Sequence, residues 1–505
     1  MAPGIHVVSV AANVCSRCRL HKQRCNRALP RCSRCTLKLR HCDYSVASNS
    51  VPAPQQDALR SELLVISECH GFFDLSARGE QEFVQLISNW TTNFDNNLGY
   101  FTQLTNDILQ ESGLELSGLI DRFSTSIHRW FPVIDVERLR EDAQTLRELP
   151  EVDATVPLLV LALLLFDLLQ RCEFGTSAEP KKLYSASKRI MVALISLTEK
   201  TDARLVQVQA LIALYECSQG MVYKAQLTLS SALTMVTLSD SYTRETDIPL
   251  QTKVSLLILD RLIMLSSADN SIPSLCNPNS PFSKGIEHHI RRHFVGESAS
   301  FGVSPSQQLY TMAQVVLASG RALHHVYCSH HGYEVDESYD SVDHAMQALV
   351  TALMSSKDSH SMYLCDIISL AICSLIVLRQ SHAKQQTFML SSLDDLALQT
   401  SCQMIWDTAK ISFHAIRGTD VSRVSLIGMF CQLRGVYAAI DVSHNYTTRD
   451  DMEDMLFTME NFFRRWTIGG DGSVEKYSDW YLRKKGDKAV TNKLENDAEC
   501  RIPVK

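Results

Sequence analysis

Six cysteines between residues 15 and 42 are the feature that most constrains how this chain can fold. They form two copies of the unit Cys-x2-Cys-x6-Cys, and the members are Cys15, Cys18, Cys25, Cys32, Cys35 and Cys42. In a chain without a secretory signal at its start, such spacing predicts metal binding rather than disulfides. Six thiolates can complete two tetrahedral Zn²⁺ sites if two sulfurs bridge both ions. Because the two units repeat each other, the bridging sulfurs should hold equivalent positions, and Cys15 and Cys32 are the natural candidates.

The segment that carries the cysteines is also strongly basic. Residues 1–50 contain nine Lys and Arg and one Asp, a net charge of +8, whereas the rest of the chain contains 40 basic and 55 acidic residues. Two Zn²⁺ ions and six thiolates would lower the charge of the segment only to about +6. A compact cationic surface joined to an anionic body predicts nucleic acid as the partner.

The sequence CSRCRLHKQRCNRALPRCSRCTLKLRHCDYS resembles the DNA-binding domain of the fungal Zn2Cys6 binuclear-cluster transcription factors. The spacings between all six cysteines match, as do the basic residues between the second and third cysteines, Pro30 in the loop between the halves, and Tyr44. A disulfide knot and a metallothionein-like scavenger are the alternatives, but a knot needs an oxidising compartment and a scavenger needs no basic residues. The resemblance implies two Zn²⁺ ions in one cluster, double-stranded DNA as partner, and a nuclear location.

The resemblance also implies which side chains meet DNA. Members of the family contact a CGG triplet through a lysine that Lys22 matches here, and Lys or Arg can donate to guanine O6 and N7 in the major groove. His21 stands where many members carry a second basic residue, and it can still donate a hydrogen bond. The second half has Leu39 at the position equivalent to Lys22, so only the first half keeps a long donor. The residues expected to contact phosphate are Arg17, Arg19, Arg24, Arg34, Lys38 and Arg40. A solvated basic surface that serves nuclear import is the alternative for all of these residues.

The rest of the chain predicts a mostly α protein, because apolar residues recur at helical spacing and Gly and Pro are sparse. Leu205, Val208, Ile212 and Tyr215 form one such stripe, and a second stripe runs from Met452 to Trp466 between Thr448 as N-cap and Gly469 as stop. Surface loops are predicted at 268–285, 295–305 and 329–338. The predicted parts are an N-terminal tail (1–14), the zinc cluster domain (15–42), a linker (43–57), a helical segment of unclear role (58–115), an all-α regulatory domain (116–470) and a C-terminal tail (471–505).

Four segments of this body resemble the regulatory domain of fungal cluster transcription factors, namely 119–135, 156–169, 206–220 and 256–265. Within the last of these, Asp260 and Arg261 put two charges into an apolar helix, which predicts a structural ion pair, with effector binding as the alternative. The longest apolar run, Val156 to Leu169, is too short to span a bilayer. No membrane partner is therefore predicted.

These observations predict a zinc-dependent DNA-binding transcription factor of RNA polymerase II that recognises CGG-type triplets and regulates a metabolic or secondary-metabolite gene cluster. No catalytic motif is present, so an enzyme is not predicted. The alternative is a zinc-sensing or redox-sensing regulator whose helical body is the functional part. The transcription machinery is an implied partner. Because residues 58–70 do not sustain heptads, the sequence leaves open whether the chain forms a homodimer or stays a monomer.

Overall fold

The chain forms two compact units, Met1–Cys69 and His70–Lys505. In the computed structural model, the described residues are 11, 13–15, 18, 24–29, 32–37, 94–148, 153–171, 179–197, 202–242, 248–267, 270–293, 304–355, 362–385, 392–416, 425–442, 462 and 466. These residues contain helices and no β-strand, which confirms the predicted mostly α class with a small zinc module ahead of a helical body.

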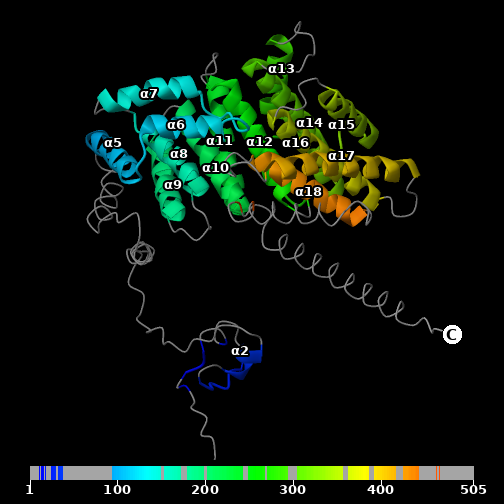
Figure 1. Cartoon of the computed structure of the whole chain (residues 1–505), viewed down its shortest axis with the longest axis horizontal. Helices are drawn as coiled ribbons and strands as arrows, with labels where there is room; N and C mark the ends of the chain where they lie inside the picture. The colour runs from blue at the N-terminus through cyan, green and yellow to red at the C-terminus, as the bar shows by residue number, and fades with distance from the viewer. Residues whose placement is uncertain are drawn as a thin grey trace, which may run out of the picture. The chain divides into compact units, whose positions relative to one another are not determined.

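One short helix, α2 (Ser33–Leu37), belongs to the first unit, and the other described helices build the second. They are α5 (Phe94–Glu111), α6 (Leu116–Thr125), α7 (Val136–Glu148), α8 (Thr155–Arg171), α9 (Glu179–Leu197), α10 (Ala203–Ser218), α11 (Val222–Tyr242), α12 (Leu250–Ser266), α13 (Pro281–His293), α14 (Pro305–His331), α15 (Tyr339–Met354), α16 (Met362–Gln385), α17 (Ser392–Ile416) and α18 (Leu426–Val442). Helices α5 to α9 lie at one end of the body and α13 to α18 at the other, with α10 to α12 between them (Figure 1).

Helix α10 is enclosed on all sides by other parts of the body. Every residue from Leu205 to Ser218 is buried, so the predicted stripe of Leu205 to Tyr215 is confirmed but covers one side of a helix that is enclosed all round. Helices α8, α9, α11 and α12 pack against it. A helix without a polar face must be interior, because no side of it could meet water without exposing apolar surface.

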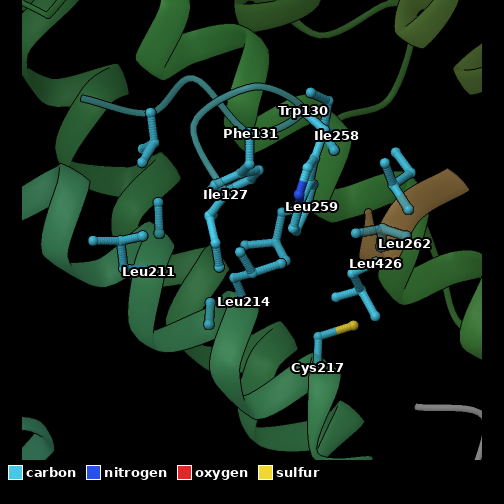
Figure 2. Packing of buried hydrophobic residues seen from close by; sticks show 14 of the residues in the cluster. Ile127, Trp130, Phe131, Leu211, Leu214, Cys217, Ile258, Leu259, Leu262 and Leu426 are labelled. Carbon is cyan, nitrogen blue, oxygen red and sulfur yellow. The ribbon is translucent and has the colours of Figure 1, made fainter. Parts of the chain in front are cut away.

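The connection that follows α6, residues 126–135, packs against α10 and α12 and completes the core there. Ile127, Trp130 and Phe131 are all buried and pack between the side chains of these two helices (Figure 2). Thr252 of α12 donates its hydroxyl to the carbonyl of Val133 at 2.8 Å, which fixes this connection to α12. Leu426 of α18 packs next to Leu262 of α12 in the same view. The segment 119–135 therefore contributes core residues to the body.

The ion pair predicted for Asp260 and Arg261 is confirmed. Both side chains are buried in α12 and hydrogen-bonded to each other. The guanidinium also donates to the carbonyls of Val316 and Cys276, each at 3.1 Å. Asp260 accepts the backbone N–H of Leu275 at 2.8 Å. Since each charge has several polar partners, this pair serves the structure of the body.

The loop predictions are partly wrong. Residues 270–280 are a loop, but Cys276 within it is buried. The reason is that the buried Asp260–Arg261 pair hydrogen-bonds with the backbone of Leu275 and Cys276 in this loop. Helix α13 begins at Pro281, inside the predicted loop 268–285, and α14 continues to His331. Gly332 then ends α14 at a φ of 70°, a left-handed conformation that glycine adopts without strain. The second predicted stripe lies outside the described residues except for Trp466, which the structure buries.

A second buried arginine, Arg379, links helices at the end of the body that α13 to α18 form. Arg379 of α16 pairs with both carboxylate oxygens of Asp343 of α15, at 2.6 and 2.9 Å. It also donates to the carbonyl of Ala397 and to the hydroxyl of Ser401, both on α17. One side chain therefore links three helices through charge-assisted hydrogen bonds.

Among the described residues, Cys365–Gln385 of α16 is the helical segment whose length and composition would suffice to cross a bilayer. In this structure 72% of its apolar window is buried inside the body, as is typical of a core helix. No membrane partner is implied.

Asp366 on α16 should make the stability of the body depend on pH. Burial raises the pKa of this carboxyl to about 7, against the opposing effects of a hydrogen bond with Ser425 and the charge of Arg129. The folded chain therefore binds more protons than the unfolded chain between the two pKa values, and stability falls as the pH rises toward 7. We expect Asp366→Asn to stabilise the body by roughly 1–3 kcal/mol at about pH 8 and much less at about pH 5. Urea unfolding at both pH values measures this difference, and an equal effect at both would contradict it.

Candidate metal centre

The second half of the cysteine segment is organised by α2. Cys32 directly precedes this helix and Cys35 lies within it, so the three-residue spacing puts both sulfurs on one side of a single turn. Thr36 closes the turn by donating its backbone N–H to the carbonyl of Cys32 at 3.0 Å. The backbone N–H of Cys35 also donates to the sulfur of Cys32 at 3.5 Å. The backbone therefore supplies a hydrogen bond to a sulfur that would carry negative charge as a thiolate ligand.

Four buried thiols converge in the first unit. The Sγ atoms of Cys15, Cys18, Cys32 and Cys35 all lie within 4.8 Å of one another. Three of these separations are 3.9 Å between Cys15 and Cys32, 3.9 Å between Cys15 and Cys35, and 3.8 Å between Cys18 and Cys32. A tetrahedral zinc with Zn–S bonds of about 2.3 Å places its sulfurs about 3.8 Å apart. The donor set and its spacing therefore fit zinc bound by thiolates.

A fifth thiol joins this group. The sulfur of Cys25 lies 3.9 Å from that of Cys15. Five thiols in contact are one more than a single four-coordinate zinc can bind. Cys15 contacts Cys25 of its own half and Cys35 of the other half, and Cys32 contacts Cys18 across the same boundary. The sixth predicted ligand, Cys42, lies outside the described residues.

Comparison with known families agrees with this geometry. Residues 13–50 match the family model described as the fungal Zn(2)-Cys(6) binuclear cluster domain. This segment is a Zn2Cys6 domain. It binds two zinc ions, as the spacing of the cysteines predicts, and its presence supports the assignment of the chain as a zinc-dependent DNA-binding transcription factor. No curated protein matches the chain.

The electrostatics of the Zn2Cys6 domain explain why a metal is needed there. Burial raises the pKa of the Cys18 thiol well above its usual range, and hydrogen bonds with Cys15 and Cys32 add to this effect. Burial would also raise the pKa of Cys25, but hydrogen bonds from the backbone N–H groups of Cys15 and Arg27 lower it to about 7. Several thiolates can share this small volume only with a compensating positive charge. Zn²⁺ supplies that charge, and its binding releases the thiol protons.

The loop between the two halves is held by contacts that sequence reasoning missed. The side-chain oxygen of Asn26 accepts the backbone N–H of Ser33 at 3.0 Å, so the residue after Cys25 binds the first residue of α2. Arg27 follows with a φ of 59°, and its carbonyl accepts the N–H of Ala11 at 2.8 Å. Asn side chains often hydrogen-bond to nearby backbone groups, and this tendency is the sequence signal from which a contact of Asn26 with the backbone could have been predicted.

The structure describes two of the predicted DNA-contacting residues of the Zn2Cys6 domain. Arg24, next to Cys25, and Arg34, in α2, are both exposed and belong to different halves. Arg27 is exposed as well, so the described part of the domain carries three arginines on its surface. Lys22 and His21 lie outside the described residues, as do Arg17, Arg19, Lys38 and Arg40.

Proposed function

We propose that this chain is a sequence-specific transcription factor that recognises CGG-type triplets in the nucleus and regulates a metabolic or secondary-metabolite gene cluster. The observation that carries the proposal is the group of five thiols in contact within a segment that matches the Zn2Cys6 family. The family is one of DNA-binding transcription factors, and the proposal assigns the chain no enzymatic activity. The helical body from about residue 116 onward would be the regulatory domain, and the transcription machinery its partner.

Within the cluster, we propose Cys15 and Cys32 as the two bridging ligands. Three contacts join thiols of opposite halves, Cys15 with Cys32, Cys15 with Cys35, and Cys18 with Cys32, and each of them includes Cys15 or Cys32, as expected of bridging sulfurs. Cys18 and Cys25 would complete the first zinc site, and Cys35 and Cys42 the second. This arrangement follows the internal repeat of the sequence, in which Cys15 and Cys32 are equivalent.

Metal binding would give the module its fold and its DNA-binding surface. A segment of this length has too little apolar core to fold unaided, so zinc supplies the folding free energy, on the order of 10 kcal/mol per structural ion. The folded halves present Arg24 and Arg34 to solvent, where they would contact phosphates together with Arg17, Arg19 and Lys38. Lys22, with His21 beside it, would contact the guanine edges of the triplet in the major groove.

Salt dependence tests the proposed DNA binding. The full chain, with two bound zinc ions, should bind a duplex with CGG triplets with a log–log slope of about −0.9 per phosphate contact. Fluorescence anisotropy of a labelled duplex, measured over a series of salt concentrations, gives this slope. A zinc-sensing or redox-sensing regulator that does not use DNA would show no preference for the CGG duplex over a scrambled one. That result would favour the alternative function.

Lys22→Ala tests the proposed base contact. We expect it to weaken binding to the CGG duplex by about 1–3 kcal/mol and to leave binding to scrambled DNA nearly unchanged, because a base contact contributes to the cognate site alone. Arg34→Ala is the matched control, since an exposed arginine on phosphate should weaken both complexes alike. If Lys22→Ala weakened the cognate and scrambled complexes equally, Lys22 would not be a base-contacting residue.

A further inference from the structure

Two buried thiols meet where α16 packs against α18 in the helical body. Cys373 of α16 and Cys431 of α18 are both fully buried, and the thiol of Cys431 donates a hydrogen bond to the sulfur of Cys373. A single buried cysteine acts as a small hydrophobic side chain, and its reactivity is seldom used. Two cysteines in contact, however, are the reactants from which a disulfide forms. This thiol pair lies outside the zinc module and belongs to the second unit of the chain.

The two helices approach each other closely enough for a covalent link. Asp366, Ser369 and Cys373 follow each other at intervals of three and four residues, so they share one face of α16. A Cβ atom at Gly428 of α18 would lie 3.2 Å from the Cα atom of Asp366, and Gln432 donates to the hydroxyl of Ser369 at 3.0 Å. A disulfide requires the two Cα atoms to lie within about 7 Å. Helices whose backbones are in such close contact permit that approach.

A positive charge lies beside the thiol pair. Arg434 follows Cys431 by three residues, on the next turn of α18. Its guanidinium donates to the carbonyl of Ser267 at 2.9 Å and to the side chain of Asn270 at 3.5 Å, and both of these partners are uncharged. The acidic groups whose charge acts on Arg434 are the two thiols. Arg434 can therefore stabilise a thiolate at this place.

The surroundings divide the roles of the two thiols. The hydrogen bond from Cys431 lowers the pKa of Cys373, and the charge of Arg434 adds to this effect, whereas burial opposes it. Burial raises the pKa of Cys431 well above its usual range, and its hydrogen bond with Cys373 and the nearby carboxyl of Asp366 raise it further. Cys373 therefore loses its proton first, and Cys431 keeps its own. The thiolate is the form that attacks an oxidant, so Cys373 is the nucleophile of the pair.

We propose that Cys373 and Cys431 form a site of reversible oxidation by a hydroperoxide, at which a disulfide joins α16 to α18. The Cys373 thiolate attacks one oxygen of the hydroperoxide, the O–O bond breaks, and the leaving oxygen takes the proton that the thiol released. The sulfur of Cys431 then attacks the sulfenic acid on Cys373, the S–O bond breaks, and the hydroxyl leaves as water with the Cys431 proton. With hydrogen peroxide, two thiols are oxidised and one peroxide is reduced to two waters.

The position of Arg434 also limits which oxidants reach the pair. Both thiols are fully buried, whereas Arg434 beside them is partly exposed. The pair therefore lies beneath one layer of side chains, where a molecule close to water in size can enter and a bulky thiol reagent cannot. This accounts for the choice of a small hydroperoxide as the reactant.

Peptide mapping of the full zinc-loaded chain after treatment with hydrogen peroxide tests the site. Mass spectrometry without reduction should find the peptides of Cys373 and Cys431 linked, and dithiothreitol should separate them. The urea midpoint of the body should be higher in the oxidised chain and return on reduction, because the link closes a long loop. Cys431→Ala should leave a sulfenic acid on Cys373 that dimedone labels. The matched control is Cys365→Ala, two turns earlier on α16 and partly exposed, which should form the link as the wild type does.

Two comparisons show whether the folded pair itself reacts. Cys217 and Cys402, buried thiols on α10 and α17, should stay reduced under the same treatment. Arg434→Gln should slow formation of the link at least about tenfold at pH 7, since it removes the charge that favours the thiolate. The link is measured on its own peptides, so oxidation of the Zn2Cys6 thiols does not affect the result. A wild-type chain that keeps both thiols, oxidation of Cys217 and Cys402 at the rate of the pair, or an unchanged rate in Arg434→Gln would each overturn the proposal. The wild-type map decides it even if Cys431→Ala does not fold.

Discussion

Cys15→Ser should release both zinc ions and abolish binding to a CGG duplex. The sulfur of Cys15 lies 3.9 Å from the sulfurs of Cys25, Cys32 and Cys35, so it contacts ligands of both halves. If it bridges the two ions, its removal takes one ligand from each of them. Each structural zinc contributes on the order of 10 kcal/mol to folding, and no apolar core in a segment this short can offset that loss. We therefore expect the module to unfold while the helical body keeps its structure.

Native mass spectrometry measures the outcome directly as zinc ions per chain. Cys25→Ser is the informative comparison, because it removes a terminal ligand of one site and leaves four thiols for the other, so up to one zinc should stay. Cys217→Ser, at a buried thiol of α10 in the helical body, should keep both ions. A Cys15→Ser chain that keeps two zinc ions would refute the bridging role, as would one that loses no more zinc than Cys25→Ser does.

The sequence contained the chemistry of the metal centre but few of its supporting contacts. Zinc dictates the number and spacing of thiolates, so six cysteines in two repeats predict the ligands, and the structure brings five of these thiols into contact. The bridging pair stays a prediction. Asn26 supports the loop through two hydrogen bonds to Ser33, because its side-chain oxygen accepts the backbone N–H and its side-chain amide donates to the hydroxyl. The sequence does not show that Ser33 is the partner of Asn26, because the two residues belong to different halves of the module and meet only when it is folded.

The same contrast holds in the helical body. The spacing of apolar residues predicted helices, because burying one side of a helix requires that spacing. The charges of Asp260 and Arg261 predicted an ion pair, since isolated buried charges are too costly. Their other partners, Cys276 in a loop and Val316 on α14, are 15 and 55 residues away from Arg261. Segments so distant come together through packing, so the sequence placed the loop on the surface although the structure buries part of it.

Gly320→Ala should be strongly destabilising, although alanine normally favours a helix. Gly320 lies within α14, where replacing Gly by Ala in an exposed position gains about 1 kcal/mol. A Cβ atom at Gly320, however, would lie 2.5 Å from the Cζ atom of Arg261 and 2.8 Å from its Nε. The guanidinium of Arg261 is held in place, because it is hydrogen-bonded to Asp260 and to the carbonyls of Val316 and Cys276.

The clash therefore outweighs helix propensity, and we expect a loss of roughly 2–4 kcal/mol in the free energy of unfolding, the range of overpacking combined with a disturbed buried ion pair. Urea unfolding followed by tryptophan fluorescence measures it. Gly285→Ala on α13 is the matched control, because a Cβ there would meet nothing within 4 Å and should be neutral or slightly stabilising. If Gly320→Ala were as stable as Gly285→Ala, the guanidinium of Arg261 would be free to move. Its hydrogen bonds would then not fix α12 against α14.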